Sequence, residues 1–408
     1  MKQFLSIIWV SLIVLQLNAQ STIKLMTYNL LHFPSGTNIQ DRKEDLRYIL
    51  NDYQPDIFMV CELEDADGAD QILNYCLGTT DYDAAYFTQN HSGSGYPLQQ
   101  MLYFNKHKFE LVNETYLVTY IRDINHYTLK LKTPNPDDEI FMDVYVAHLK
   151  ASSGTDNERK RKDMVQVLVD DLVNIPNNHF VIFAGDFNLY SSYEPAYQLM
   201  TNPNNAVVFK DPVNRPGSWH NNTQFADLDT QSTHTVSDND YVGGGLDDRF
   251  DFIMMSENLF NNPVLKYLPG TYKAYGNNGH CFNLAITNSS CDSPEYDSTL
   301  RNHLYRMSDH LPVVASLETP VTLASPYYTT NTFRLDQGNM VEQSLSISSD
   351  ALPQFDINIY NMAGQKVLQK NNYEAGEQID FDTYKNGIYF LEINSPQYHQ
   401  VIKFVKAD

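Results

Sequence analysis

The sequence VIFAGDFNLY, residues 181–190, begins with apolar residues that end at Gly185, and it then places Asp186 and Asn188 on either side of Phe187. An apolar run followed by a glycine is typical of a buried strand that stops at a tight turn. Side chains two positions apart in an extended chain point in the same direction, so Asp186 and Asn188 are expected to emerge side by side. A carboxylate beside an amide, next to a hydrophobic core, indicates a task other than packing.

Strand-like segments alternate with helix-like segments on both sides of this strand, from about residue 22 to about residue 317. Such an alternation predicts a layered α/β domain. The expected strands are residues 23–31, 55–63, 101–105, 141–149, 181–187 and 249–256, and the expected helices are residues 41–53, 69–78 and 157–175. A basic run, residues 159–162, lies in the last helix and is expected to form its solvent-facing side.

The character of the sequence changes near Pro320, after which strand and turn patterns continue without a clear helix. Residues 355–370 alternate around a Met-Ala-Gly turn, and residues 387–408 supply further strands, which together predict a small β-sandwich. We therefore divide the chain into an N-terminal segment (1–20), an α/β domain (21–318), a linker (319–329) and a C-terminal β-sandwich (330–408).

The N-terminal segment has the layout of a cleaved secretory signal peptide. It combines an early lysine, an apolar stretch from Phe4 to Leu15 and small residues near Ala19. The apolar stretch is short for a membrane span, and no later segment reaches the required length. We therefore expect an exported protein without a transmembrane segment after signal cleavage.

The cysteines and the charge fit this location. Cys281 and Cys291 flank a polar loop and are expected to form a local disulfide, whereas Cys61 and Cys76 lie in apolar patterns as buried thiols or a further pair. The formal net charge of −22 argues against a broad basic face that holds nucleic acid. It is compatible with an enzyme that acts on phosphates through bound cations, because a divalent ion is usually the largest charge in its site.

Polar residues lie at the ends of several apolar runs, where they do not contribute to the packing of a buried strand. In α/β folds ligands collect where strand ends converge, so these side chains are expected to meet in one cleft. They are Asn29, Glu62, His148, Asp186 with Asn188, Asp251, and Asp309 with His310. Each alone also fits a solvated turn, a structural histidine or a plain ion pair, so the hypothesis depends on their occurring together.

A resemblance to the endonuclease/exonuclease/phosphatase superfamily is carried by these motifs in this order: TYN (27–29), CELE (61–64), AHLK (147–150), GDFN (185–188), RFDFI (249–253) and SDHLPV (308–313). That superfamily includes secreted deoxyribonucleases, abasic-site endonucleases, neutral sphingomyelinases and inositol-phosphate phosphatases. The resemblance covers about residues 22–317. It implies a four-layered α/β sandwich, in which two central, mostly antiparallel sheets are flanked by helices.

The same resemblance implies a divalent metal site. Hard oxygen ligands suit Mg²⁺, with Mn²⁺ or Ca²⁺ as alternatives. Glu62 is then the principal metal ligand, with Asn29 and Asp309 close by. The ion serves as a Lewis acid on the phosphate and can stabilise the leaving oxygen.

The remaining polar residues take catalytic roles by analogy with the family. Asp186 positions or deprotonates the attacking water, and Asn188 donates to a phosphoryl oxygen. His148 donates to the phosphate or protonates the leaving group, and His310 is held by Asp251, which fixes its tautomer. Whether His310 or Asp186 activates the water stays open at this point.

The sequence departs from the family pattern in two places. Asp248 precedes the RFDFI motif and is an alternative partner of His310, although the spacing from the strand favours Asp251. The strand that begins near Gln99 and Gln100 lacks the family's leading glycine, so the residues on the substrate side are left open there.

The C-terminal segment is similar to the sorting domain of the bacterial type IX secretion system. The resemblance is carried by the N-x-x-G-Q-x-V hairpin (361–367), the strand NGIYFLEI (386–393) and a final strand flanked by basic residues. It implies recognition by the secretion machinery, passage across the outer membrane and then cleavage or surface anchoring. A generic carbohydrate- or surface-binding sandwich is the alternative.

These observations together predict a secreted or cell-surface, metal-dependent phosphodiesterase, in particular a nuclease that acts on extracellular DNA or RNA. A sphingomyelinase-like phospholipase C or a small-molecule phosphatase is the first alternative. A lipid enzyme should expose an apolar hairpin beside the cleft, and residues 261–278 are a weak candidate. The second alternative is a non-catalytic surface-binding protein on the same fold, which predicts the loss of metal or histidine positions.

Overall fold

The structure is a computed structural model in which the chain forms two compact units. It describes residues 21–35, 42–92, 98–133, 135, 138–238, 240–321, 323, 333–349, 352–394 and 399–407. The expected signal peptide lies outside the described residues, as does most of the expected linker.

The first sheet of the larger unit has seven strands within the described part of the chain. Its order is β11 (Lys266–Tyr267), β13 (Val313–Thr319), β1 (Ser21–Phe33), β2 (Ile57–Leu63), β4 (Gln99–Asn105) and β3 (Tyr82–Ala84), with β12 (Lys273–Ala274) also paired to β13. Strands β1 and β2 are parallel, whereas β13 and β4 run antiparallel to their neighbours. The carboxyl ends of β1 and β2 therefore meet at one edge of this sheet.

The second sheet has six strands within the described residues. Its order is β5 (Phe109–Leu117), β6 (Ile124–Leu131), β7 (Phe141–His148), β8 (Phe180–Asp186), β10 (Asp251–Ser256) and β9 (Phe209–Lys210). Strands β7 and β8 are parallel, and β6 and β10 run antiparallel to them. Each sheet thus contains one parallel pair among antiparallel strands.

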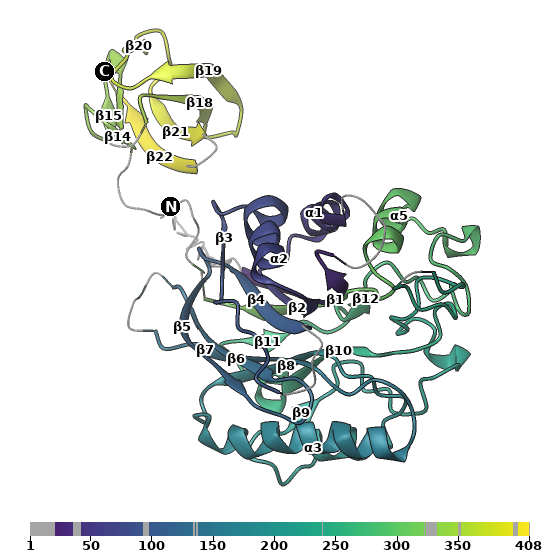
Figure 1. The fold of residues 1–408 in the computed structure, drawn as a ribbon. Coiled ribbons are helices and arrows are strands. Elements are labelled where there is room, and N and C mark those ends of the chain that lie inside the picture. The colour runs from purple at the N-terminus through teal and green to yellow at the C-terminus, as the bar shows by residue number, and fades with distance from the viewer. Residues whose placement is uncertain are drawn as a thin grey trace, which may run out of the picture. The chain divides into compact units, whose positions relative to one another are not determined.

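Helices cover the outer faces of the two sheets, as Figure 1 shows. They are α1 (Arg42–Tyr53), α2 (Ala66–Gln71), α3 (Thr155–Asp171), α4 (Pro195–Met200) and α5 (Ser298–Met307). Helices α1, α2 and α5 lie over the first sheet and α3 lies over the second (Figure 1). The predicted order of four layers, helix, sheet, sheet and helix, is confirmed.

Alternation along β1 explains how one strand serves two layers. Ile23 and Leu25 belong to the core that also contains Val144 of β7, whereas Met26 belongs to a second core with Leu46 of α1. Successive strand residues point to opposite faces of a sheet, so a strand that is apolar on both faces is buried on both. Each such side chain contributes about 1.5–3 kcal/mol of burial free energy.

The smaller unit is all-β within the described residues. A five-stranded sheet has the order β15 (Met340–Val341), β22 (His399–Lys406), β21 (Gly387–Asn394), β18 (Gln354–Asn361) and β19 (Lys366–Glu374). Two short pairs accompany it, β14 (Phe333–Leu335) with β17 (Ile347–Ser349) and β16 (Ser344–Leu345) with β20 (Ile379–Asp380). The predicted all-β character of this region is confirmed.

The predictions for the cysteines are confirmed, and one prediction for a helix is wrong in part. Cys281 and Cys291 form a disulfide, and Cys61 and Cys76 are buried free thiols. The basic run 159–162 was predicted to face solvent, but Arg161 is completely buried, where its Nε donates to Glu194 Oε2 at 2.8 Å. The same guanidinium donates to the carbonyl oxygens of Lys150 and Ser152, so it fixes the loop that follows β7.

None of the helices in the described part of the chain combines the length and the apolar character needed to cross a membrane.

Candidate active site

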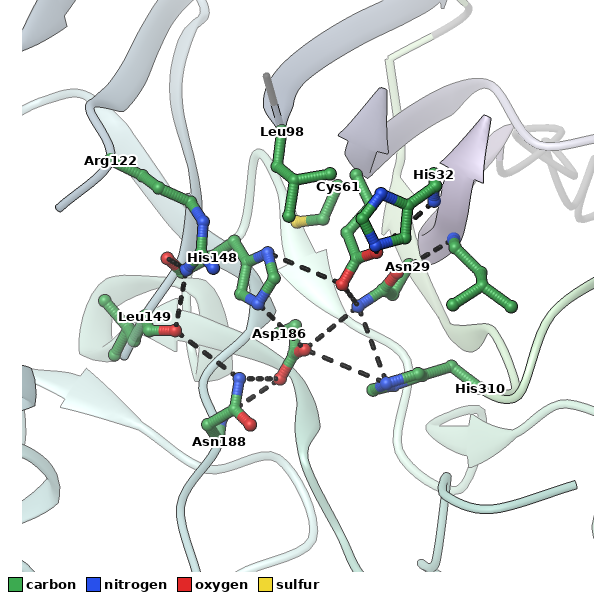
Figure 2. A network of polar contacts seen from close by, with 12 residues as sticks. Asn29, His32, Cys61, Leu98, Arg122, His148, Leu149, Asp186, Asn188 and His310 are labelled. Carbon is green, nitrogen blue, oxygen red and sulfur yellow. Dashed lines mark hydrogen bonds and ion pairs between the residues drawn. The ribbon is translucent and has the colours of Figure 1, made fainter. Parts of the chain in front are cut away.

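The carboxyl ends of the two parallel strand pairs face each other across the two sheets, and most of the predicted site residues lie there (Figure 2). Asn29 lies opposite Cys61 in the β1–β2 register, and Glu62 follows directly. His148, Asp186 and Asp251 lie side by side on β7, β8 and β10, because Asp186 is the register partner of both others. Residues far apart in the sequence are therefore brought together by strand register.

Asn29 joins the two sheets. Its Nδ2 donates to Glu62 Oε1 and to Asp186 Oδ2, both at 3.0 Å, and lies 3.5 Å from His310 Nε2. Its Oδ1 accepts from the backbone N–H of Leu31 at 3.0 Å. The amide nitrogen of Asn29 therefore bridges the carboxylates of Glu62 and Asp186.

The backbone at these strand ends is not extended. Glu62 has φ 59° and Asn188 has φ 52°, both in the left-handed region that side chains other than glycine rarely adopt. Gly185 has φ 132°, and a Cβ atom there would lie 2.0 Å from the carbonyl oxygen of Ala147. Such conformations cost on the order of 1–3 kcal/mol and cluster at functional sites.

Asp186 and Asn188 lie side by side, as predicted. Strand β8 ends at Asp186, and the backbone N–H of Phe187 still donates to the carbonyl oxygen of Phe250. Asn188 Nδ2 donates to Asp186 Oδ1 at 2.8 Å. The backbone N–H of Asn188 donates to the same oxygen at 3.1 Å. The prediction that the two side chains emerge side by side is confirmed, although the strand stops at Asp186 and Asn188 itself has left-handed backbone.

His310 is held by Asp251. Its Nδ1 lies 2.7 Å from Asp251 Oδ2, and both side chains are buried. Asp248, the alternative partner, instead lies 2.7 Å from Nδ1 of His220. The structure therefore places Asp251, not Asp248, beside His310.

His148 lies on the opposite side of Asp186. Its Nε2 is 3.4 Å from Asp186 Oδ2 and its Nδ1 is 3.9 Å from Glu62 Oε1, and its Nδ1 makes no hydrogen bond although it is buried. Arg122 lies next to it and donates through Nη1 to the carbonyl oxygens of His148 and Leu149. His148 thus has a cation beside it in addition to Asp186, whereas His310 has a second carboxylate, Asp251.

Asp309 is placed at the edge of the group. Its Oδ2 accepts from Gln231 Nε2 at 3.2 Å and from the backbone N–H of Val242 at 3.1 Å. Its Oδ1 is buried and makes no hydrogen bond. The neighbouring Ser308 hydroxyl donates to the carbonyl oxygen of Asn29, which ties this loop to β1.

Burial and charge shift the acid–base behaviour of these groups strongly. Burial, together with the nearby carboxylates of Asp251 and Glu62, raises the pKa of Asp186 to about 7, although His310 acts in the opposite direction. Burial opposes protonation of His310, but the carboxylates of Asp251, Asp186 and Asp309 together outweigh burial and hold the His310 pKa well above its ordinary value. Burial, followed by the charge of Arg122, holds the pKa of His148 well below its ordinary value.

Three residues that contact this group were missed by sequence reasoning. The backbone N–H of His32 donates to Glu62 Oε2 at 3.3 Å, Arg122 contacts the end of β7, and Gln231 contacts both Asp309 and His310. His32 lies past the predicted strand pattern, and the other two lie in loops. The strands on either side of Arg122, β5 and β6, were not predicted, so no sequence pattern indicated its place.

The donor set fits a hard divalent cation. Glu62, His148 and Asp186 offer ligand atoms within 4.8 Å of one another, and so do Asp186, Asp251 and His310. The buried, unpartnered Asp309 Oδ1 adds a carboxylate oxygen at the rim. Carboxylate and amide oxygens are the ligands that Mg²⁺ and Mn²⁺ prefer.

Comparison with protein-family models decides the family. Residues 26–310 match the model of the endonuclease/exonuclease/phosphatase family. The chain belongs to this family. Members of the family are generally hydrolases that act on phosphodiester bonds and typically depend on a divalent metal. The resemblance found in the sequence motifs is thereby confirmed.

A second family model matches the C-terminal unit. Residues 339–407 match a secretion system C-terminal sorting domain, of the type IX system. Such a domain implies export, to the cell surface or to the surroundings of the cell. A comparison with curated proteins gives no match.

Several solved structures resemble the chain at low identity. The human Nocturnin catalytic domain with bound sulfate anion is 18% identical, with a TM-score of 0.46, and the similarity covers 74% of this chain and 94% of that one. An endonuclease/exonuclease/phosphatase from Bacteroides vulgatus is 16% identical, with a TM-score of 0.46 and coverage of 73% and 99%. D. rerio TDP2 complexed with single strand DNA product is 16% identical, with a TM-score of 0.46 and coverage of 73% and 100%.

Proposed function

We propose that this protein is an exported, divalent-metal-dependent phosphodiesterase whose substrate is DNA or RNA. The observation that carries the proposal is one buried cluster in which Asp186 stands between two histidines, with Glu62 joined to it through Asn29. A non-catalytic protein on this fold has no need to keep such a costly arrangement of buried charge.

Asp186 and His310 are suited to handle the attacking water. His310 Nε2 lies 3.9 Å from Asp186 Oδ2, so a base and an imidazole stand side by side at the centre of the cluster. The pKa of Asp186, raised to about 7 by burial, is close to the value at which a general base works best at neutral pH. Asp251 holds the other imidazole nitrogen of His310 and thereby orients the ring.

His148 and Asn188 face the phosphate in this proposal. Nδ1 of His148 has no hydrogen-bond partner among the described residues, and we assign this atom to a phosphoryl oxygen or to the leaving group. Asn188 uses its amide on Asp186 Oδ1 and, at 3.4 Å, on the carbonyl oxygen of Leu149. The longer of these contacts is the one that Asn188 can exchange for a phosphoryl oxygen.

Glu62, with Asn29 and Asp309, is assigned to the metal. When bound, Mg²⁺ or Mn²⁺ supplies Lewis acidity at the phosphate and stabilises negative charge on the leaving oxygen. Glu62 is fixed for this purpose from two sides, by Asn29 Nδ2 and by the backbone N–H of His32.

A nucleic acid fits the surroundings better than a lipid does. Tyr120 is 72% exposed between β5 and β6, two residues along the chain from Arg122, whose guanidinium contacts the end of β7 at His148. Bases stack on exposed aromatic rings, and guanidinium groups bind phosphates. In residues 261–278, the candidate for a lipid-binding hairpin, β11 and β12 both pair with β13, and Tyr267 and Tyr272 are buried.

A substrate panel tests this proposal. Purified protein is incubated with plasmid DNA, single-stranded RNA, sphingomyelin vesicles and a generic phosphodiester, each with Mg²⁺, with Mn²⁺ and with chelator. We expect digestion of DNA or RNA that stops in chelator. Hydrolysis of sphingomyelin or of a phosphomonoester with intact nucleic acids would contradict the nuclease assignment and leave the site assignment in place.

A further inference from the structure

Gln231 contacts two members of the candidate active site at once. Its Nε2 lies 2.8 Å from His310 Nε2 and donates to Asp309 Oδ2 at 3.2 Å. The other polar neighbours of His310 Nε2 are more distant, since Asn29 Nδ2 lies at 3.5 Å and Asp186 Oδ2 at 3.9 Å. Gln231 is therefore the nearest polar neighbour of the imidazole atom that faces the reaction, among the described residues.

The main chain holds Gln231 on both sides. Its backbone N–H donates to the carbonyl oxygen of Asp248, and its own carbonyl oxygen accepts from Asp247 and Asp248. An isolated bridge joins Gln231 to His310, and the backbone N–H of Leu311 donates to Thr230 on the preceding position. Because the backbone of Gln231 is already fixed, its side chain loses little further conformational entropy when it contacts Asp309 and His310.

The side-chain amide of Gln231 has the hydrogen-bonding groups that contacts with Asp309 and His310 require. One NH₂ group carries two N–H bonds, so it can donate to the Asp309 carboxylate and, while the His310 ring is neutral with its Nδ1–H facing Asp251, to the ring Nε2. A glutamate of the same length has no proton to donate and would place a further negative charge against Asp309. An apolar residue of the same size would leave Asp309 and His310 without this link.

We propose that Gln231 is a positioning residue, which sets the separation between the Asp309 carboxylate and the reactive edge of the His310 ring. This inference rests on the proposed function, in which Asp309 lies on the metal side and His310 handles the water. Gln231 fixes both relative to Asp186 before substrate binds. Loss of Gln231 is expected to lower the rate of the chemical step, because Asp309 and His310 are then no longer held at a fixed distance from each other.

The test compares Gln231→Leu and Gln231→Glu with the wild type and with the control Gln224→Leu. Gln224 lies seven positions earlier, in the short 3-10 helix Thr223–Phe225, and is exposed. Steady-state hydrolysis is measured on the substrate found by the panel. We expect both Gln231 variants to lose about 10- to 100-fold in kcat with KM changed by less than about twofold, and the control to keep wild-type values.

A second readout does not depend on turnover. Histidine-selective ¹⁵N labelling of the full chain allows the His310 ring nitrogens to be followed by NMR, with assignment by His310→Ala. We expect the Nε2 resonance of His310 to move in Gln231→Leu and to stay in place in Gln224→Leu. If Gln231→Leu fails to fold, Gln231→Asn takes its place, since its shorter side chain cannot reach both acceptors.

The outcomes are distinguishable. Unchanged kcat together with an unchanged His310 resonance overturns the proposal, and a loss confined to KM overturns it too, because Gln231 would then bind substrate. A wild-type protein that hydrolyses nothing overturns the proposed function, while the His310 resonance still decides whether Gln231 positions the ring.

Discussion

His148 and His310 are buried to the same degree and stand on either side of one carboxylate, Asp186, yet their surroundings are opposite. His310 has Asp251 at 2.7 Å, which together with the other nearby carboxylates holds its pKa well above the ordinary value despite burial. His148 has Arg122 beside it in addition to the carboxylates of Asp186 and Glu62, and burial, followed by the charge of Arg122, holds its pKa well below the ordinary value. Burial alone therefore does not decide the charge of a histidine here, and the partner on the next strand or loop does.

Because their charged neighbours differ, His148 and His310 are suited to different roles in the proposed reaction. A ring held by a carboxylate is oriented and can carry a positive charge, which suits proton transfer with water. A ring kept neutral beside an arginine offers a donor or acceptor to phosphate without adding charge. In each case the residue that sets the behaviour comes from another segment, β10 for His310 and the β5–β6 turn for His148.

Removal of His310 is the largest change that the comparison predicts. His310→Ala is expected to lower kcat by about 10³-fold, because the proton-transfer group is lost. The matched control is His280→Ala, at an exposed position away from the cluster. Circular dichroism and the unfolding temperature check that both variants are folded. A folded His310→Ala variant with more than about a tenth of the wild-type rate would contradict the assignment.

Removal of the negative charge of Asp251, which contacts His310, is expected to have the next largest effect on kcat. Asp251→Asn should lower kcat by about 10- to 100-fold, since His310 keeps its place but loses the carboxylate that orients it. Asp248→Asn is the sharpest control, because Asp248 is close in sequence but contacts His220 instead. Steady-state kinetics on both variants measures the difference. Equal losses in the two variants would mean that the strand position of Asp251 carries no special role.

The smallest predicted effect concerns the neighbour of His148. Arg122→Met removes a positive charge next to the ring, so protonation of His148 becomes less unfavourable and its pKa is expected to rise toward the ordinary value. Arg122→Lys keeps the charge and should give a smaller rise. NMR titration of ¹⁵N-labelled histidines in chelator measures both shifts. A His148 pKa that does not move in Arg122→Met would show that burial alone accounts for its low value.

Much of this arrangement could be predicted from the sequence, because strand ends are marked by pattern. The apolar run 181–184 with Gly185 indicated a buried strand and a turn, and Asp186 was expected to face a cleft. The same reasoning placed Glu62 and His148 at strand ends. The spacing also favoured Asp251 over Asp248 as the partner of His310, which is the pairing that the structure shows.

The other features of the site could not be predicted, because they depend on contacts between residues far apart in the sequence, and no local sequence pattern marks such contacts. Gln231 lies in irregular chain, and its contacts with Asp309 and His310 span 78 and 79 positions in the sequence. Arg161 looked like one of several surface cations, and only the tertiary structure shows Glu194 opposite it. The left-handed backbone at Asn188 also gives no sign in the sequence, because the residue type alone does not fix φ.

The central claim is that Glu62, Asp186 and His310 form one metal-dependent centre for phosphodiester hydrolysis. The most direct measurement follows hydrolysis of bis(p-nitrophenyl) phosphate by wild type and by Glu62→Ala, first in chelator and then after Mg²⁺ or Mn²⁺ is restored. We predict that the wild type is inactive in chelator and recovers with metal, and that Glu62→Ala stays at least about 100-fold lower at every metal concentration. Hydrolysis by the wild type that continues in chelator, or a Glu62→Ala variant that matches it, would contradict the account.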